Sequence, residues 1–102
     1  MDDIIKKIEQ QVESNNIIIY IKGTPQKPMC GFSSQVIHTL NLLELEYAYV
    51  NVLENEAIRK FLPIYSNWPT FPQVYYKGKL IGGADIITEL YKNKTLKKVL
   101  TE

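Results

Sequence analysis

The chain has 102 residues, of which 45% are hydrophobic and 23% charged, and its formal net charge is +1 at pH 7. This length and composition predict one water-soluble globular domain, over residues 1–102, with a single core. The near-neutral charge, without a basic stripe, argues against a nucleic-acid partner, and the longest apolar run, Ile17–Ile21, is far too short to cross a membrane. The acidic start after Met1 and the single cysteine predict a protein of the reducing cytoplasm.

The first half of the chain alternates between helix and strand patterns. Apolar residues at helical spacing predict two helices, and the second of them is expected to place Phe32 on its apolar side. A continuous β-branched run predicts a first strand that is buried on both faces, and a loop with two prolines, over 23–29, follows it. The predicted elements are a helix over Asp3–Val12, a strand over Ile17–Ile21, a helix over Gly31–Leu43 and a strand over Tyr47–Val52.

The second half of the chain contains a hairpin between helices. Pro63 is expected to bend or end the first of these helices, and Lys77-Gly78 predicts a tight turn between two strands. Asp85 is a suitable N-cap for the helix that follows the hairpin. The predicted elements are a helix over Glu56–Tyr65, strands over Gln73–Tyr76 and Lys79–Ile81, a helix over Ile86–Lys92 and a short helix over Leu96–Leu100.

This order of elements predicts an α/β fold. The first strand, the helix after it and the second strand form a right-handed βαβ unit with parallel strands. The hairpin adds two antiparallel strands, which gives a thioredoxin-like fold with a four-stranded mixed sheet flanked by helices. Four tyrosines on these strands are interpreted as sheet packing, namely Tyr47, Tyr49, Tyr75 and Tyr76.

Cys30 is the one cysteine, and the position three residues later, where a redox dithiol has its second sulfur, is Ser33. Such a site cannot close an internal disulfide, so any disulfide must form with another molecule. One sulfur also cannot hold a zinc ion or an iron–sulfur cluster alone, because these need about four ligands. Any metal would have to be shared with a second chain or with a small thiol.

Cys30 directly precedes a predicted helix, where free N–H groups and the helix dipole favour the thiolate. Lys22 and Lys27 are expected to add positive charge nearby. His38 lies two helical turns further on, too far to act as the base of this cysteine. The alternative is that Cys30 is a buried and inert small residue.

Two further segments, Trp68–Val74 and Gly82–Asp85, have the pattern of ligand-binding loops. Proline at a strand entrance leaves a backbone edge free, and a cis bond before Pro72 would let Phe71 present its N–H and C=O to a peptide-like ligand. The two glycines allow a close backbone approach, and the helix start after them offers N–H groups to an anion. The alternatives are a stiff surface loop and a purely structural turn.

Lys22 and Arg59 are candidates for binding a carboxylate. Lys22 ends the first strand, and Arg59 lies on the helix that leads into the Trp68 loop. The alternative is that both side chains are simply solvated, as exposed cations usually are.

Together these segments strongly resemble those of the monothiol glutaredoxins of CGFS type. The resemblance covers nearly the whole chain and is to the single-domain bacterial form, without the thioredoxin-like extension of multidomain relatives. The motifs that carry it are Lys22-Gly23-Thr24-Pro25, Cys30-Gly31-Phe32-Ser33, Trp68-Pro69-Thr70-Phe71-Pro72-Gln73 and Gly82-Gly83-Ala84-Asp85.

The resemblance implies a glutathione site. By analogy with the family, Lys22 and Arg59 would bind the glycine carboxylate of glutathione. The Phe71 main chain would bind its cysteinyl part, and Ala84 with Asp85 would bind its γ-glutamyl end.

The resemblance also implies that Cys30 is both the catalytic thiol and a ligand of a labile [2Fe–2S] cluster between two protomers. Two Cys30 thiolates and two glutathiones would supply the four sulfurs that such a cluster needs. Pro72 would be the family's cis-proline. Ala84 stands where close relatives often have a second cysteine, which removes any internal disulfide.

The function implied by the resemblance is that of a cluster carrier. A homodimer bridged by the cluster and two glutathiones would deliver it to apo iron–sulfur proteins and also pair with BolA-family proteins. The alternative is a glutathione-dependent oxidoreductase that deglutathionylates protein mixed disulfides, which needs only one cysteine. The loop from Thr24 to Pro28, which CGFS proteins have and efficient dithiol glutaredoxins lack, weighs against the alternative, because it would hold glutathione in a poor geometry for exchange.

Overall fold

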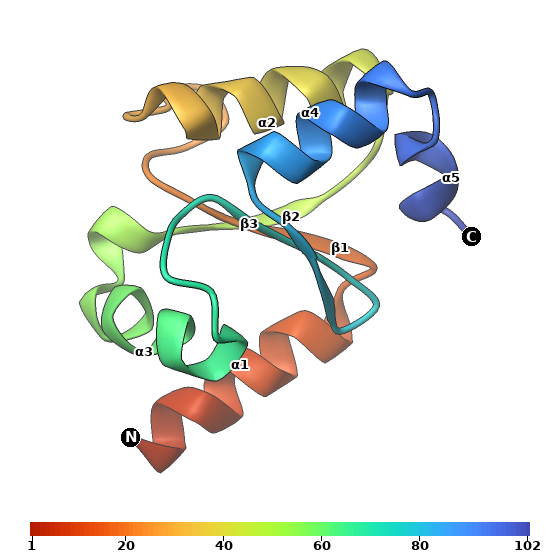
Figure 1. Cartoon of the computed structure of the whole chain (residues 1–102). Helices are drawn as coiled ribbons and strands as arrows, with labels where there is room; N and C mark the ends of the chain where they lie inside the picture. The colour runs from red at the N-terminus through yellow and green to blue at the C-terminus, as the bar shows by residue number, and fades with distance from the viewer.

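Helices and strands alternate along the chain, and the computed structural model describes all residues from 1 to 102. Figure 1 shows a central sheet between two groups of helices. The helices are α1 (Asp2–Ser14), α2 (Gly31–Leu42), α3 (Glu56–Ser66), α4 (Ala84–Lys92) and α5 (Leu96–Val99), with a 3-10 turn η1 (Val52–Glu54). The strands are β1 (Ile17–Ile21), β2 (Ala48–Asn51), β3 (Gln73–Tyr76) and β4 (Lys79–Gly82).

The four strands form one mixed sheet in the order β2-β1-β3-β4. β1 pairs in parallel with β2 and antiparallel with β3, and β3 and β4 form the hairpin. Helices α2 and α4 cover one face of the sheet, and α1 and α3 cover the other (Figure 1). The predicted α/β fold, with its parallel βαβ unit and its antiparallel hairpin, is therefore confirmed.

The core has two layers, because the side chains of a strand alternate between the two faces of a sheet. Ile17, Ile19 and Ile21 of β1 pack toward α2 and α4, while Ile18 and Tyr20 pack toward α1 and α3. All five residues of β1 are buried, as the continuous β-branched run predicts. Burying one isoleucine side chain contributes about 1.5–3 kcal/mol to folding, so β1 anchors both layers and fixes the position of the loop that follows it.

The element boundaries differ from the predicted ones by a few residues at several helix ends. α1 runs further at both ends than predicted, and a 3-10 turn that the sequence did not predict follows β2. Pro63 does not end α3, which continues to Ser66. The ring of Pro63 removes only one helical hydrogen bond here, and its carbonyl still accepts a bond from the Trp68 N–H at 3.2 Å.

Two assignments of buried side chains are wrong. Phe32 is 59% exposed, because the first turn of α2 borders a pocket instead of the sheet. Tyr49 is 43% exposed: it lies on edge strand β2 between Ala48 and Val50, which pack toward α1 and α3, so its side chain points to the opposite face. Of the other three tyrosines, Tyr75 is buried and the remaining two are half-buried.

The predicted N-cap of α4 is also wrong. The helix begins at Ala84 with Gly83 as its N-cap, and the Gly83 carbonyl accepts a hydrogen bond from the Ile87 N–H at 3.1 Å. Asp85 instead lies in the first turn, where a carboxylate is stabilised by the positive end of the helix dipole. Its side chain is exposed and free to meet another molecule.

The topology brings four separate segments to one edge of the sheet. β1 ends beside the start of β3, because the two strands are antiparallel and Tyr20 pairs with Gln73. The loop to α2 leaves from this edge, the loop before β3 arrives at it, and α3 and the start of α4 lie beside it (Figure 1). The candidate residues, although far apart in sequence, therefore converge there.

Candidate functional site

A pocket of about 880 Å³ lies at this edge. The candidate residues Lys22, Cys30, Arg59, Phe71, Ala84 and Asp85 all line it, whereas Lys27, His38, Gly82, Gln73 and Val74 do not. His38 is an exposed residue further along α2. The residues of the pocket, from the four segments that form it, are Lys22, Cys30, Phe32, Arg59, Pro63, Trp68, Pro69, Thr70, Phe71, Pro72, Gly83, Ala84, Asp85 and Ile86.

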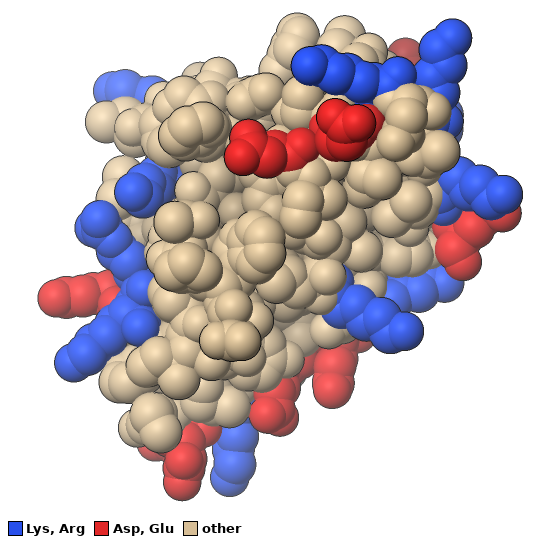
Figure 2. All heavy atoms as spheres, in the orientation of Figure 1, with Lys and Arg blue, Asp and Glu red and all other residues tan.

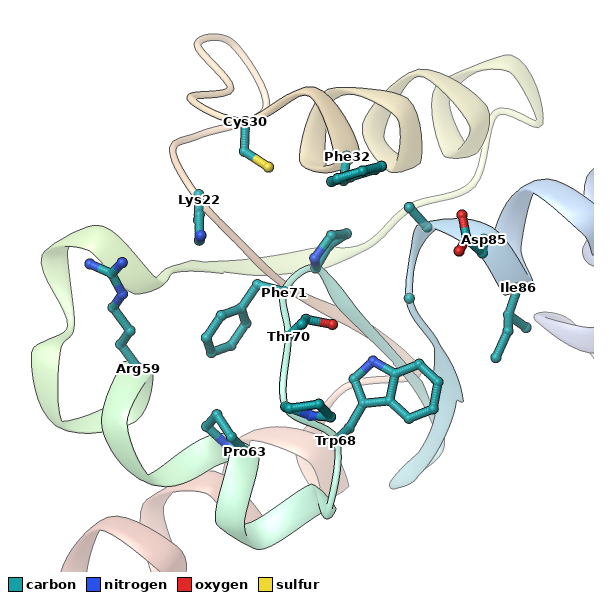
Figure 3. Close-up of a pocket in the computed structure, with 14 residues that line it drawn as sticks. Lys22, Cys30, Phe32, Arg59, Pro63, Trp68, Thr70, Phe71, Asp85 and Ile86 are labelled. Atoms are coloured by element: carbon teal, nitrogen blue, oxygen red, sulfur yellow. The ribbon is translucent and has the colours of Figure 1, made fainter.

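One side of the pocket, which we call the thiol wall, consists of Lys22, Cys30 and Phe32 (Figure 3). Cys30 is the N-cap residue of α2 and is half-buried with a free thiol. Its carbonyl accepts the Ser34 N–H at 2.9 Å, and the N–H groups of Phe32 and Ser33 in the first turn donate to its sulfur. This placement excludes the alternative of an inert, fully buried cysteine.

The loop before Cys30 is held tightly at both ends. The Met29 N–H donates to the Lys22 carbonyl at 2.9 Å, and the Gly23 N–H donates to Asn51 Oδ1 at 3.0 Å. Gly23 has φ +99°, and a Cβ atom built on it would lie 2.5 Å from the Lys27 carbonyl oxygen. Only glycine fits this conformation without strain, so the Lys-Gly pair after β1 is what lets the loop fold back and deliver the thiol.

The pKa of the Cys30 thiol is lowered from its ordinary value. Partial burial by itself raises the pKa. This effect is outweighed by hydrogen bonds from the backbone N–H groups of Ser33 and Phe32, by a hydrogen bond from the Ser33 hydroxyl, and by the nearby charge of Lys22. The predicted effects of the helix start and of Lys22 are confirmed. Lys27 does not contribute, and the Ser33 hydroxyl is a contribution that the sequence did not predict.

Ser33 has a structural role in the place where a dithiol site has its second sulfur. Its side chain is fully buried, and its hydroxyl accepts a hydrogen bond from the Lys22 N–H at 3.1 Å. The same hydroxyl bonds to the Cys30 sulfur. It therefore links the end of β1 to the thiol, whereas the neighbouring Ser34 is exposed.

The facing side, which we call the loop wall, is formed by residues 68–72 before β3 (Figure 3). The bond between Phe71 and Pro72 is cis, as predicted. The Trp68 N–H donates to Ser66 Oγ and to the Pro63 carbonyl, both at 3.2 Å. The Phe71 N–H and C=O have no hydrogen-bond partner inside the chain, so they remain free for a ligand in the pocket.

The start of α4 closes the pocket against the loop wall. Gly83 lies so close to it that a Cβ atom would come within 3.1 Å of the Pro72 carbonyl oxygen and 3.4 Å of Trp68 Nε1. Trp68 Nε1 is itself buried without a hydrogen-bond partner. The second glycine of the pair thus permits the close backbone approach that the sequence predicted.

The pocket is polar at its two ends. Lys22 and Arg59 lie on one side of the loop wall and Asp85 on the other (Figure 3). In the space-filling view, a wide uncharged surface separates basic side chains at the left from two acidic side chains near the top, whereas acidic and basic side chains lie next to each other elsewhere on the rim (Figure 2). Arg59 and Asp85 are exposed and Lys22 is half-buried, so all three can exchange water for a ligand.

The chain has no group of three or more His, Cys, Asp or Glu side chains that could hold a metal ion. None of the helices has the length and apolar character needed to cross a bilayer.

The sequence profile of the glutaredoxin family matches residues 17–81. Glutaredoxin 4 of Buchnera aphidicola (subsp. Schizaphis graminum) is 54% identical over 99 residues, 97% of this chain and 92% of that protein. Glutaredoxin 4 of Escherichia coli K12 is 44% identical over 102 residues, covering 100% of this chain and 89% of that protein.

Two solved structures are similar to the fold. A monomeric truncated mutant of Trypanosoma brucei 1-C-Grx1 has a TM-score of 0.85 and 38% identity, covering 94% of this chain and 87% of that one. A buckwheat glutaredoxin in complex with glutathione has a TM-score of 0.85 and 27% identity, covering 98% of this chain and 89% of that one. The chain therefore belongs to the glutaredoxin family, as a monothiol member of CGFS type.

Proposed function

We propose that the pocket binds glutathione. The observation that supports this most directly is that a free thiol of lowered pKa shares one pocket with an unpaired peptide group at Phe71 and with charges of opposite sign at its ends. Glutathione has a matching arrangement: two carboxylates, an amino group, two peptide bonds and a central thiol. The glutathione complex of the buckwheat relative supports the same choice of ligand.

Each part of the tripeptide has a candidate partner. Lys22 and Arg59 bind the glycine carboxylate through charge-assisted hydrogen bonds, and the Phe71 N–H and C=O pair with the cysteinyl residue as a neighbouring strand would. Asp85 carries the negative charge that the γ-glutamyl amino group requires. The free N–H groups at the start of α4, at Ala84 and Asp85, bind the γ-glutamyl carboxylate.

We further propose that the protein carries a labile [2Fe–2S] cluster as its cargo. The chain supplies a single thiolate, Cys30, and the pocket would place one glutathione thiol next to it. Two such protomers supply the four sulfurs that the cluster needs. Because half of these ligands belong to exchangeable glutathione, the assembly suits delivery of clusters to apo iron–sulfur proteins in a reducing cytoplasm, with a BolA-family protein as a second partner.

The second candidate activity is removal of glutathione from protein mixed disulfides. The observation that favours it is the lowered pKa of a half-exposed thiol. The Cys30 thiolate would attack the glutathione sulfur, and the released protein thiolate would take up a proton. A second glutathione thiolate would then attack the mixed disulfide on Cys30, which regenerates the thiolate and releases oxidised glutathione.

Anaerobic reconstitution tests the proposed function. The protein is incubated with iron, sulfide and glutathione, and a parallel sample is incubated without glutathione. We expect a brown, dimeric species only in the first sample, and a return to colourless monomers when glutathione is removed by gel filtration. A colourless sample that reduces a glutathionylated peptide would favour the oxidoreductase, and a dimer that persists after iron chelation would contradict bridging by the cluster.

A further inference from the structure

Gln73 and Ser33 are the two fully buried polar side chains next to the pocket, and Gln73 does not line the pocket. It is the first residue of β3 and its exposed fraction is 0%. A buried amide has to satisfy its donors and its acceptor inside the protein. The hydrogen-bond partners of Gln73 therefore indicate its structural role.

The two donors of Gln73 both point at the loop wall. Nε2 donates to the Trp68 carbonyl at 3.0 Å and to the Thr70 carbonyl at 3.2 Å. On its other side, Gln73 Oε1 accepts the hydroxyl of Tyr75 at 2.9 Å. The reverse orientation of the amide would place Oε1 against two carbonyl oxygens, so the hydrogen bonds fix which end faces the loop.

The support behind Gln73 is rigid. Tyr75 is 2% exposed and packs edge-on against Tyr20 with ring centroids 5.6 Å apart. Tyr20 in turn donates its hydroxyl to Gln11 Oε1 of α1 at 2.8 Å. Gln73 thus connects the loop wall to the core layer under α1, not to the thiol wall.

This arrangement decides which backbone groups the loop offers to a ligand. The carbonyls of Trp68 and Thr70 are turned inward to Gln73, and the N–H of Trp68 is turned inward to Ser66 and Pro63. The N–H and C=O of Phe71 are left without a partner inside the chain. An exposed loop without such a tie would have to be ordered at the moment of binding.

We propose that Gln73 is a positioning residue, whose amide clamps the loop wall so that the Phe71 peptide group is fixed toward the pocket before glutathione binds. The inference rests on the proposed function for its ligand, but the clamp itself is a property of the free protein. Ordering the backbone of one residue costs about one to two kilocalories per mole, so loss of the clamp should weaken glutathione binding roughly tenfold.

The test compares Gln73→Met with Tyr75→Phe. Gln73→Met keeps the length of the side chain but removes both donors, whereas Tyr75→Phe disturbs the same buried network and leaves both donors on the loop. Calorimetric titration with reduced glutathione should give a dissociation constant roughly tenfold higher for Gln73→Met and within about twofold of the wild type for Tyr75→Phe. The proposal would be overturned if a folded Gln73→Met variant bound glutathione as tightly as the wild type. It would also be overturned if, in both variants, the loss of glutathione affinity simply followed the loss of thermal stability.

Two NMR measurements keep the test decisive if glutathione does not bind or if Gln73→Met does not fold. In the free wild-type protein, the Gln73 carboxamide protons should exchange slowly with water, and fast exchange would refute the clamp. Backbone N–H order parameters for Trp68, Thr70 and Phe71 should be near 0.85 in the wild type and fall toward about 0.6 in Gln73→Met. A wild type that shows the clamp but binds no glutathione would contradict the proposed function alone.

Discussion

The thiol wall presents side-chain atoms to the pocket, whereas the loop wall presents main-chain atoms. On the thiol wall, the sulfur of Cys30 and the ammonium of Lys22 are the groups proposed to react and to bind, and the backbone N–H groups of α2 support the sulfur. On the loop wall, the peptide group of Phe71 is proposed to face the pocket, and a side chain, Gln73, holds the carbonyls of Trp68 and Thr70 from behind. In the proposed function, side-chain atoms therefore react, and main-chain atoms recognise the peptide part of glutathione.

This difference means that the two walls respond differently to substitution. A side-chain group can be deleted by changing the residue that carries it, with little effect on the fold. A main-chain group can be changed only through the residues that hold it in place. Substitutions on the thiol wall should therefore separate chemistry from stability, and substitutions behind the loop wall should couple affinity to local order.

The largest expected effect is that of Cys30→Ser. The variant should lose cluster binding and thiol exchange completely, because the chain has no other sulfur nucleophile. Serine is nearly isosteric and the site is half-buried, so the free energy of unfolding should change by less than about 1 kcal/mol. Visible absorption after reconstitution and a thermal melt measure the two quantities, with Ser34→Ala as the neighbouring control. A coloured dimer from Cys30→Ser would refute the assignment of the ligand.

The next largest effect concerns the glycine that folds the loop back to the thiol. Gly23→Ala should lower the free energy of unfolding by about 2–3 kcal/mol, because its Cβ would lie 2.5 Å from the Lys27 carbonyl oxygen at φ +99°. Gly31→Ala is the matched control on the other side of Cys30, since a Cβ there would meet nothing within 4 Å. Denaturant melts should leave this control within about 0.5 kcal/mol of the wild type; equal losses for both would contradict the argument.

The sequence predicted the charged and thiol groups of the pocket better than the support of the loop wall, because side-chain chemistry is evident from residue type and main-chain support is not. Cys30, Lys22 and Arg59 are candidates for this reason, and helical and strand periodicity placed them at one sheet edge. Phe71 was predicted from a loop motif, but the role of Gln73 was not, because a buried glutamine at a strand start has no local signature. The exposure of Phe32 and the N-cap at Gly83 were also missed, since both depend on contacts between distant segments.

A smaller effect is expected from substitution of Lys22, the cation of the thiol wall. Lys22→Ala should weaken glutathione binding by roughly tenfold, because a hydrogen bond to a charged group contributes about 1.5–3 kcal/mol and half-exposed groups contribute at the lower end. Lys27→Ala is the matched control, because Lys27 has the same charge but does not line the pocket. Calorimetric titration should find the control within about twofold of the wild type. Equal weakening by both would mean that only the overall positive charge matters.

The smallest effect is a shift in the pKa of Cys30, and it measures how strongly the groups around the sulfur stabilise the thiolate. Thiolate absorbance should titrate with a midpoint below the ordinary value of about 8.5, since the hydrogen bonds from Ser33 and Phe32 and the charge of Lys22 outweigh the effect of burial. Ser33→Ala should raise the midpoint, because it deletes the one side-chain donor to the sulfur.

The lowered pKa of Cys30 also determines how the free energy of unfolding changes with pH. A lowered pKa in the folded state favours the thiolate, so its contribution to stability is complete above the pKa of the unfolded chain and is lost as the pH falls through the folded midpoint. Thermal melts of the wild type and Cys30→Ser across this range should therefore diverge in favour of the wild type as the pH rises. A wild-type midpoint above the ordinary pKa of a cysteine thiol would mean that burial dominates, and the thiol wall would then need the bound glutathione or a metal to form its thiolate.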